Sequence, residues 1–270
     1  MDLSKYHSHV ETGLHGRRAL VTAASKGLGF ASARALAAEG CRVAISSSNA
    51  EHLEVAVQAL HAEGGDVQAR VADLRQADQC TSLADWAVTT FGGLDVLVNN
   101  TRGPAFGTVA DLDDAAWSEA FNLVLMSAVR LSRAALPALR RDHGGAIVNL
   151  TSIAAHQPVD NLMLSNALRP AVVAMGKTLA TEAAPEVRVN SILTGRFETD
   201  RIVDENRHQA SKLGISLREV RALSVRQIPL RRYGRPDELA AAVVFLAGDA
   251  SSFITGTTLS VDGGEYPGLF

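Results

Sequence analysis

The sequence predicts a single-domain α/β protein with one doubly wound parallel sheet of about seven strands and helices on both faces. Three observations support this prediction. Short apolar runs alternate with longer Ala- and Leu-rich segments of helical spacing along the whole chain. Most of the short runs are apolar throughout, as expected of strands that are covered on both faces. A glycine-rich turn also joins the first run to the first helical segment.

The elements follow from this alternation in chain order. Strands are expected at residues 18–22, 42–46, 67–72, 94–99, 146–150, 188–193 and 258–261. Helices are expected between them at residues 28–39, 50–62, 77–91, 114–140, 159–183 and 236–247. Glycines follow four of these helices, at 40, 64–65, 92–93 and 144–145, where left-handed caps are common.

Residues 195–235 break this alternation, because they form a long, polar, arginine-rich insertion. One short helix is expected there, since Ser216 and Glu219 make a capping box ahead of Val220. Such an insertion suits a lid over an active site. Its ten cations against five anions favour a substrate with a carboxylate, an acyl thioester or a phosphopantetheine arm, while solvated helix faces and subunit contacts explain most of the charges equally well. We expect a domain at 16–264, an N-terminal extension at 1–15 and a tail at 265–270.

Composition excludes several classes of protein. The 270 residues carry 26 basic and 29 acidic side chains, a net charge of −3, so neither nucleic acid nor a membrane surface is an expected partner. The two cysteines, Cys41 and Cys80, predict neither a disulfide framework nor a metal site. Residues 1–13 lack the pattern of a signal peptide, and no apolar run is long enough for a membrane span. We therefore expect a cytoplasmic protein without a bound metal.

Several polar motifs follow the predicted strands. The first strand leads into Thr22-Ala23-Ala24-Ser25-Lys26-Gly27-Leu28-Gly29, where glycines and a helix N-terminus suit a pyrophosphate. An ordinary tight turn is the plainer reading of two glycines taken alone. The other motifs are Asp73-Leu74 after the third strand, Asn99-Asn100-Thr101-Arg102-Gly103 after the fourth, Asn122 in a long helix, Thr151-Ser152 after the fifth strand and Val261-Asp262-Gly263-Gly264 near the end.

In order and spacing, this set resembles the short-chain dehydrogenase/reductase family in its 3-oxoacyl-reductase-like branch. The resemblance runs from Gly16 to about Gly264 and implies a Rossmann-like fold, a bound nicotinamide dinucleotide and a homotetramer. Two departures, Ala23 for the first glycine of the turn and Thr101-Arg102 for Ala-Gly, leave Gly27 and Gly29 in place. The cofactor-binding residues that the resemblance implies are Ala23, Ser25, Lys26, Gly27, Leu28, Gly29, Ser47, Ser48, Asp73, Leu74, Asn99, Thr101, Arg169, Gly195 and Thr199.

A larger departure lies at the expected catalytic residues. Family members place a tyrosine thirteen residues after the catalytic serine and a lysine four residues later, and counting from Ser152 reaches Ser165 and Arg169. Tyr6, Tyr233 and Tyr266 are not placed by sequence to substitute. A serine hydroxyl is a poorer proton donor than a phenol, and an arginine stays protonated, so it can hold ribose or stabilise an oxyanion but cannot relay a proton. Pro170 next to Arg169 is unfavourable inside a helix.

The choice of cofactor depends on the end of the second strand. An acid there normally holds the ribose 2′-hydroxyl of NAD, whereas this chain has Ser46-Ser47-Ser48-Asn49. Lys26 in the phosphate turn matches NADP-using relatives, although a solvated surface lysine is an equally good reading of it alone. NADP(H) is therefore favoured, with NAD(H) as the alternative. Arg196 and His156 are candidate substrate-binding residues, and for His156 an ordinary surface histidine is the plainer reading.

These observations suggest an NADP(H)-dependent oxidoreductase that moves a hydride to or from a carbonyl or conjugated substrate, either a small molecule or one linked to an acyl carrier. Ser152 would polarise a carbonyl, Asn122 would hold a water chain, and Arg169 would fix ribose and stabilise negative charge. Water near Ser165 would deliver the proton. A decayed site, a redox-silent NADP-binding subunit, and a lyase or isomerase on the same scaffold stay open as alternatives.

Overall fold

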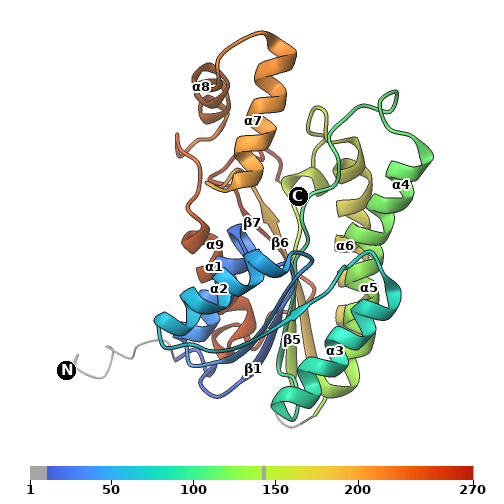
Figure 1. The fold of residues 1–270 in the computed structure, drawn as a ribbon, viewed down its shortest axis with the longest axis vertical. Helices are drawn as coiled ribbons and strands as arrows, with labels where there is room; N and C mark the ends of the chain where they lie inside the picture. Colours follow the sequence, from blue (N-terminus) through green and yellow to red (C-terminus); the bar gives the residue numbers. More distant parts are fainter. Residues whose placement is uncertain (1–10, 142–143, 270) are drawn as a thin grey trace, which may run out of the picture.

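The computed structural model describes residues 11–141 and 144–269, and it confirms the predicted fold class (Figure 1). Seven parallel strands form one sheet in the order β3-β2-β1-β4-β5-β6-β7. The strands are β1 Arg18–Val21, β2 Arg42–Ser47, β3 Asp66–Val71, β4 Val96–Asn99, β5 Gly145–Leu150, β6 Val187–Thr194 and β7 Thr258–Val261. The α-helices are α1 Gly27–Ala38, α2 Ala50–Ala62, α3 Ala77–Phe91, α4 Asp114–Ala120, α5 Ser127–Leu139, α6 Met163–Glu182, α7 Asp200–Leu213, α8 Leu217–Gln227 and α9 Pro236–Ala247.

Helices cover the sheet on both faces (Figure 1). Helices α1, α2 and α9 bury Leu36, Leu60 and Leu246 against one face, and helices α3, α5 and α6 bury their apolar sides against the other. Because both faces are covered, the central strands are apolar throughout, and Leu20 in β1 is fully buried between Ala44 of β2 and Leu97 of β4. The hydrophobic effect of these two layers stabilises the domain.

The strand order determines where a ligand can bind. Strand β1 lies between β2 and β4. The chain passes from β2 to β3 toward one edge of the sheet and from β4 to β5 toward the other edge, so the two connections run in opposite directions. This reversal opens a crevice beyond the carboxyl ends of the strands, the usual ligand site of a doubly wound sheet.

Two predicted helices differ from the structure. The single helix expected at 114–140 is α4 and α5 joined by a π-helical segment, η2 (Phe121–Met126). The helix expected at 159–183 begins at Met163, because the side chain of Asn166 bonds both the N–H and the carbonyl of Val159, at 3.0 and 2.9 Å, and holds that residue outside the helix. Pro170 lies inside α6, which continues past it.

The insertion at 195–235 contains two helices rather than one. Helix α8 starts at the predicted capping box of Ser216 and Glu219. Helix α7 was not expected, because its sequence is largely polar and lacks an apolar repeat of helical spacing. In the structure only Ile202 and Asn206 of this helix are buried. The two helices project beyond the sheet in Figure 1, and Ile202 packs with Ile228 and Tyr233 in a small core of their own. The insertion is called the lid below.

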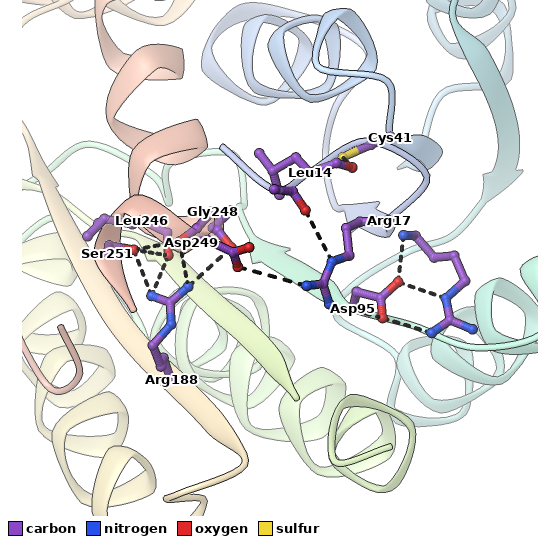
Figure 2. Close-up of polar contacts among 12 residues, drawn as sticks. Leu14, Arg17, Cys41, Asp95, Arg188, Leu246, Gly248, Asp249 and Ser251 are labelled. Carbon is purple, nitrogen blue, oxygen red and sulfur yellow. Dashed lines mark hydrogen bonds and ion pairs between the residues drawn. The ribbon is translucent and has the colours of Figure 1, made fainter. Parts of the chain in front are cut away.

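Polar contacts close the opposite, amino-terminal edge of the sheet (Figure 2). The guanidinium of Arg188 donates to the carbonyl oxygens of Leu246 and Gly248, at 2.8 and 3.0 Å, and to Ser251 Oγ at 2.8 Å, so it caps the end of α9. The part of the predicted N-terminal extension that the structure describes packs here, because Leu14 is buried and the Thr12 carbonyl accepts from the Asp249 N–H at 2.7 Å. Residues 1–10 of that extension lie outside the described residues.

Candidate active site

A cavity of about 630 Å³ lies at the carboxyl edge of the sheet. Segments that follow six strands, β1 to β6, line it together with α6 and the start of α7. The sequence-predicted residues that it brings together are Ala23, Ser25, Lys26, Gly27, Leu28, Ser47, Ser48, Asp73, Leu74, Thr101, Ser152, Ser165, Arg169, Gly195 and Thr199. Residues of the cofactor motif and of the expected catalytic set therefore share one cavity.

The turn after β1 has the geometry of a close approach to a ligand. Ala23 has a φ of 48°, a left-handed conformation that glycine adopts more readily, and Gly27 has a φ of 58°. A Cβ on Gly29 would lie 2.5 Å from the Ala23 carbonyl oxygen and 2.6 Å from Asn100 Nδ2, so this position requires glycine. Gly29 does not line the cavity. It lets the turn pack against the loop that follows β4.

Asn100 is a positioning residue that the motif contained but the sequence reasoning did not single out. Its Nδ2 donates to the carbonyl oxygens of Thr22 and Ala23, at 3.2 and 3.0 Å. In return, Thr22 Oγ1 donates to the backbone carbonyl oxygen of Asn100 at 2.8 Å. Asn99, a predicted cofactor residue, points elsewhere, since its Nδ2 donates to Ser132 Oγ and Asn149 Oδ1 at 3.0 and 2.9 Å. Asn99 therefore joins β4 to β5 and α5 rather than lining the cavity.

The end of the cavity at β2 has no acid to hold a ribose 2′-hydroxyl. Ser47, Ser48, Asn49 and His52 line it, and Ser25 Oγ donates to Ser47 Oγ at 2.9 Å. Lys26 also lines the cavity, and its Nζ lies 3.8 Å from the exposed carboxylate of Asp200 at the start of α7. Serine hydroxyls and a lysine can bind the 2′-phosphate of NADP, whereas an acidic side chain at this position would repel it.

Asp73, the acid that lines the cavity after β3, is engaged by Arg75. It accepts from Arg75 Nε at both oxygens, at 2.9 and 3.0 Å, from Nη2 at 2.8 Å and from the backbone N–H at 3.0 Å. The side-chain bonds, and then the backbone bond, lower the pKa of the Asp73 carboxyl below its usual range. Thr101 Oγ1, by contrast, is buried in the cavity wall with no hydrogen-bond partner in the described part of the chain. A buried hydroxyl without a partner and a glycine-lined turn both fit a bound dinucleotide.

Ser152, Ser165 and Arg169 form the innermost wall. The side chains of Ser165 and Arg169 are 6% and 8% exposed. Arg169 Nη1 donates to the Leu150 carbonyl oxygen at 2.9 Å, and its buried Nε has no partner within the described residues. Burial, and then the positive charge of Arg201, lower the pKa of Arg169 to about 10, so this guanidinium is still charged at neutral pH.

Ser152 keeps its proton available. Its Oγ accepts a hydrogen bond from the Ala154 N–H at 3.2 Å, at the start of the short helix η3 (Ile153–Ala155). An oxygen that accepts from the backbone is held in place, and its O–H can then donate to a substrate oxygen. A charged guanidinium and an oriented hydroxyl on one wall can stabilise negative charge on a bound molecule.

No tyrosine of the described residues lines this cavity. Tyr233 is buried in the core of the lid, and its hydroxyl oxygen accepts a hydrogen bond from Asn206 Nδ2 at 3.3 Å. Tyr266 packs its ring against that of His156, with 5.1 Å between centroids, so the predicted rim residue His156 contacts the C-terminal tail and does not line the cavity. Tyr6 lies outside the described residues.

Asn122 is held by two side-chain hydrogen bonds. It lies in η2, where its Nδ2 donates to the Ser118 carbonyl oxygen and its Oδ1 accepts from Arg130 Nη2, both at 2.9 Å. The two partners belong to the flanking helices α4 and α5, and Asn122 is not part of the cavity wall. That Asn122 holds a water chain stays a prediction, because each end of the amide can form a second hydrogen bond.

Arg196, a candidate substrate-binding residue, lies in a different environment from the other candidates. It is an ion-pair centre outside the cavity wall, with Nη1 2.8 Å from Glu205 and Nε 2.9 Å from Glu265. Burial disfavours its charge, but the two carboxylates outweigh burial and raise its pKa. Glu265 belongs to the predicted tail, so the start of this tail is fastened to the lid. Arg196 thus joins two segments of the chain, and its contact with a substrate stays a prediction.

The lid carries fewer cations toward the cavity than its composition suggested. Further ion pairs join Arg207 to Asp204, Arg221 to Glu198, Arg232 to Glu238 and Arg235 to Asp237. Arg201 is the one lid cation that lines the cavity among residues 195–235, all of which are described. Sequence reasoning counted Arg201 as one of ten lid cations and did not distinguish it.

Two further properties concern the described residues only. They contain no group of three or more His, Cys, Asp and Glu side chains that could hold a metal ion. None of their helices combines the length and the apolar character needed to cross a membrane.

Comparison with known proteins places this arrangement among dinucleotide-dependent reductases. A family model described as "Enoyl-(Acyl carrier protein) reductase" matches residues 22–265. The chain is 33% identical over 255 residues to dehydrogenase/reductase SDR family member 4 of Oryctolagus cuniculus, in a match that covers 93% of this chain and 94% of that protein.

Two solved structures share its fold. A variant of actinorhodin polyketide ketoreductase with NADPH is 30% identical, with a TM-score of 0.89 over 93% of this chain and 97% of that one. L-Sorbose reductase from Gluconobacter frateurii, complexed with NADPH and L-sorbose, is 29% identical, with a TM-score of 0.91 over 96% of this chain and all of that one.

Proposed function

Because the chain belongs to the short-chain dehydrogenase/reductase family, we propose that it is an NADP(H)-dependent oxidoreductase with a non-standard active site. The observation that carries this proposal is the buried guanidinium of Arg169 on the same wall as Ser152 and Ser165, in a cavity that no tyrosine of the described residues lines. The wall retains groups that stabilise negative charge, but it lacks the phenolic acid that the family pattern would place there.

NADP(H) is the cofactor that the site favours. The related ketoreductase and L-sorbose reductase structures contain NADPH. In this chain the phosphate turn, Lys26 and the hydroxyls of Ser47 and Ser48 would hold the adenosine phosphates, and Thr101 and Arg169 would bond the sugar nearest the reaction. When bound, this cofactor supplies or accepts the hydride.

The residues of the chain then act on the substrate oxygen. Ser152 Oγ–H donates a hydrogen bond to that oxygen, and Arg169 stabilises the negative charge that develops there as the carbonyl or conjugated π bond breaks. Ser165 is too short to fill the place of a tyrosine, so it leaves room for a water molecule. This water gives its proton to the reduced product, and the hydroxide formed is neutralised by solvent.

This arrangement favours substrates whose reduction needs little proton donation. Hydride addition to an activated alkene, a quinone or a β-dicarbonyl compound spreads the charge over several atoms, whereas a simple ketone gives a localised alkoxide that requires an acid. Removing one oxyanion donor in a comparable site costs about 3–4 kcal/mol, which is enough for Arg169 to support delocalised anions. Small molecules and acyl-carrier-linked thioesters both fit this class.

A screen of NADPH oxidation tests the proposal directly. Activated alkenes, quinones and β-dicarbonyl compounds should be consumed, and plain aldehydes and ketones should be poor substrates. Brisk turnover of plain ketones would overturn the mechanism. Tight NADPH binding without turnover of any class would instead favour the redox-silent, lyase or isomerase alternatives.

Two further properties belong to the same proposal. We place the protein in the cytoplasm, because Cys41 and Cys80 are free, buried thiols. We also propose a homotetramer, because apolar side chains of α4, η2 and α6 are left partly exposed. Phe121 of η2 is 44% exposed, and three further apolar side chains of these helices are only partly buried: Trp117, Leu125 and Met175. Such apolar side chains on long helices suit a contact between subunits.

A further inference from the structure

The cavity contains two arginines that form no ion pair with the described part of the chain. Four acids line it, and each has an ion pair of its own: Asp73 with Arg75, Asp200 with Lys26, Asp204 with Arg207, and Glu205 with Arg196. Arg102, another lining cation, pairs with Glu119. Arg169 and Arg201 form no ion pair with any residue in the described ranges 11–141 and 144–269. Burial lowers the pKa of the Arg201 guanidinium and outweighs Glu205 and Asp204, which act on it from beyond ion-pair distance, so neither arginine has a carboxylate of the described chain in direct contact.

The structure holds Arg201 in a fixed orientation. Its Nη2 donates to the Pro104 carbonyl oxygen at 2.9 Å, and its Cζ lies 3.8 Å from the centre of the Phe106 ring. A Cβ on Gly103 would lie 2.7 Å from that Cζ, so the guanidinium packs directly on the backbone of the loop after β4. An arginine of the lid thus bridges to the opposite loop, and the same side chain lines the cavity.

Arg169 and Arg201 act on the same space. Both line the cavity, and the charge of Arg201 is felt at Arg169, which is 8% exposed and whose Nε is a buried donor without a partner among the described residues. Two like charges at a shared wall repel each other, and a buried cation is costly unless an anion meets it. A bound anion removes both costs.

We propose that the substrate carries a permanent carboxylate, which Arg201 binds while Arg169 faces the oxygen that becomes negative during reduction. This inference rests on the proposed function for the role of Arg169, and it adds the substrate class: conjugated or dicarbonyl compounds that bear a carboxylic acid. A phosphate of the cofactor is the other source of an anion. The phosphate turn at 23–29 has its own donors, whereas Arg201 is directed toward Pro104 and Phe106 of the loop after β4.

Binding of a ketone probe in the presence of the oxidised cofactor, which has no hydride to donate, tests this without relying on turnover. The probes are 4-oxopentanoate and its methyl ester, titrated by calorimetry into the protein saturated with NADP⁺. The acid should bind about 10-fold or more tightly than the ester, because a charge-assisted bidentate pair is lost on esterification. Arg201→Gln should abolish this difference while leaving the affinity for NADP⁺ unchanged.

Two variants sharpen the test. Gly103→Ala keeps every charge but displaces the Arg201 guanidinium, so it should also reduce the preference for the acid. Arg218→Gln makes the same substitution at an exposed arginine of α8 that does not line the cavity, and it should leave the preference intact. Equal binding of acid and ester by the unmodified protein would overturn the proposal.

The cofactor alternative has its own outcome. Loss of NADP⁺ affinity in Arg201→Gln, with acid and ester still discriminated, would assign Arg201 to a cofactor phosphate and overturn the proposal. Reduction is measured separately with NADPH and 4-oxo-2-pentenoate. If Arg201-dependent binding of the acid is found but this alkene is not reduced, the carboxylate site stands and the proposed redox function fails.

Discussion

Arg18 and Asp95 form a bidentate ion pair at the amino-terminal edge of the sheet, with Nε to Oδ2 and Nη2 to Oδ1 both at 2.7 Å. The Arg18 backbone N–H adds a third hydrogen bond to Oδ2 at 2.8 Å, and the Asp95 side chain is only 5% exposed. Arg17 and Asp95 lie in the same polar cluster in Figure 2. The pair joins the start of β1 to the residue before β4.

The first prediction concerns stability against acid. Burial opposes the charge of Asp95, but the Arg18 bonds outweigh it and lower the pKa of the carboxyl. Its contribution is therefore fully present above the unfolded pKa of about 4 and is lost as pH falls through the lower folded value. Asp95→Asn should cost about 3 kcal/mol of unfolding free energy at pH 7, and the difference from the unmodified protein should shrink below pH 4.

Urea unfolding between pH 2 and 8 measures this. Asp66→Asn is the matched control, because Asp66 pairs with Arg42 at 3.1 Å but is 56% exposed and should contribute less than about 1 kcal/mol. Equal effects of the two substitutions would contradict the prediction.

The second prediction concerns the turn after β1. Ala23 has a φ of 48°, so Ala23→Gly should relieve about 1 kcal/mol of backbone strain and raise the melting temperature, with cofactor binding retained. Ala35→Gly, inside α1, should have the opposite effect by a similar amount. Thermal unfolding of both variants provides the comparison, and a lower melting temperature for Ala23→Gly would refute the strain argument.

The third prediction concerns the cofactor. NADPH should bind at least about 10-fold more tightly than NADH, a difference of roughly 1.4 kcal/mol, because serine hydroxyls rather than an acid line the cavity after β2. Ser47→Asp should reverse this preference by repelling a 2′-phosphate and accepting from a 2′-hydroxyl. Calorimetric titration with both dinucleotides measures it, with Thr89→Asp on α3 as a control for added charge. An NADH preference in the unmodified protein would sink the assignment.

The fourth prediction concerns the innermost wall. Arg169→Lys should lower kcat/KM for an activated alkene about 100-fold. A guanidinium can donate to the Leu150 carbonyl oxygen through Nη1 and to the substrate through its other N–H groups, whereas the single ammonium of lysine cannot reach both. Ser165→Ala should change it only slightly if water is the proton donor. Ser165→Tyr combined with Arg169→Lys should raise the reduction of simple ketones.

Steady-state kinetics with NADPH distinguishes these roles, and Arg218→Gln, at an exposed arginine of α8 outside the cavity wall, should behave like the unmodified protein in the same assay. Collapse of activity in Ser165→Ala alone would make Ser165 itself the acid.

The fifth prediction concerns assembly. Sedimentation at micromolar concentration should give a species of four times the 28.5 kDa chain mass. Phe121→Asp should reduce its size, since it places a charge on the exposed apolar side of η2, whereas Val55→Asp on α2, 66% exposed on the other side of the sheet, should not. A monomer for the unmodified protein would exclude the proposed contact.

The sequence by itself determined the sheet and its ligand edge. Apolar runs such as the one containing Leu20 are long enough to identify buried strands. The resemblance to the short-chain dehydrogenase/reductase family, counted from Ser152, identified Ser165 and Arg169, and all three residues line the cavity. These are local signals, because periodicity and motif spacing are properties of neighbouring residues. The capping box at Ser216 is equally local, and the helix starts there.

The tertiary structure alone decided which charges face the cavity. Arg196 and Arg201 are five residues apart in one polar segment, yet Arg196 is neutralised by Glu265, which lies 69 residues further along, while Arg201 packs on Pro104, 97 residues earlier. Helix α7 was likewise invisible to periodicity, because only Ile202 and Asn206 of its residues are buried. An ion pair or a packing contact depends on distance in space, and segments so far apart in sequence become neighbours only when the sheet has formed.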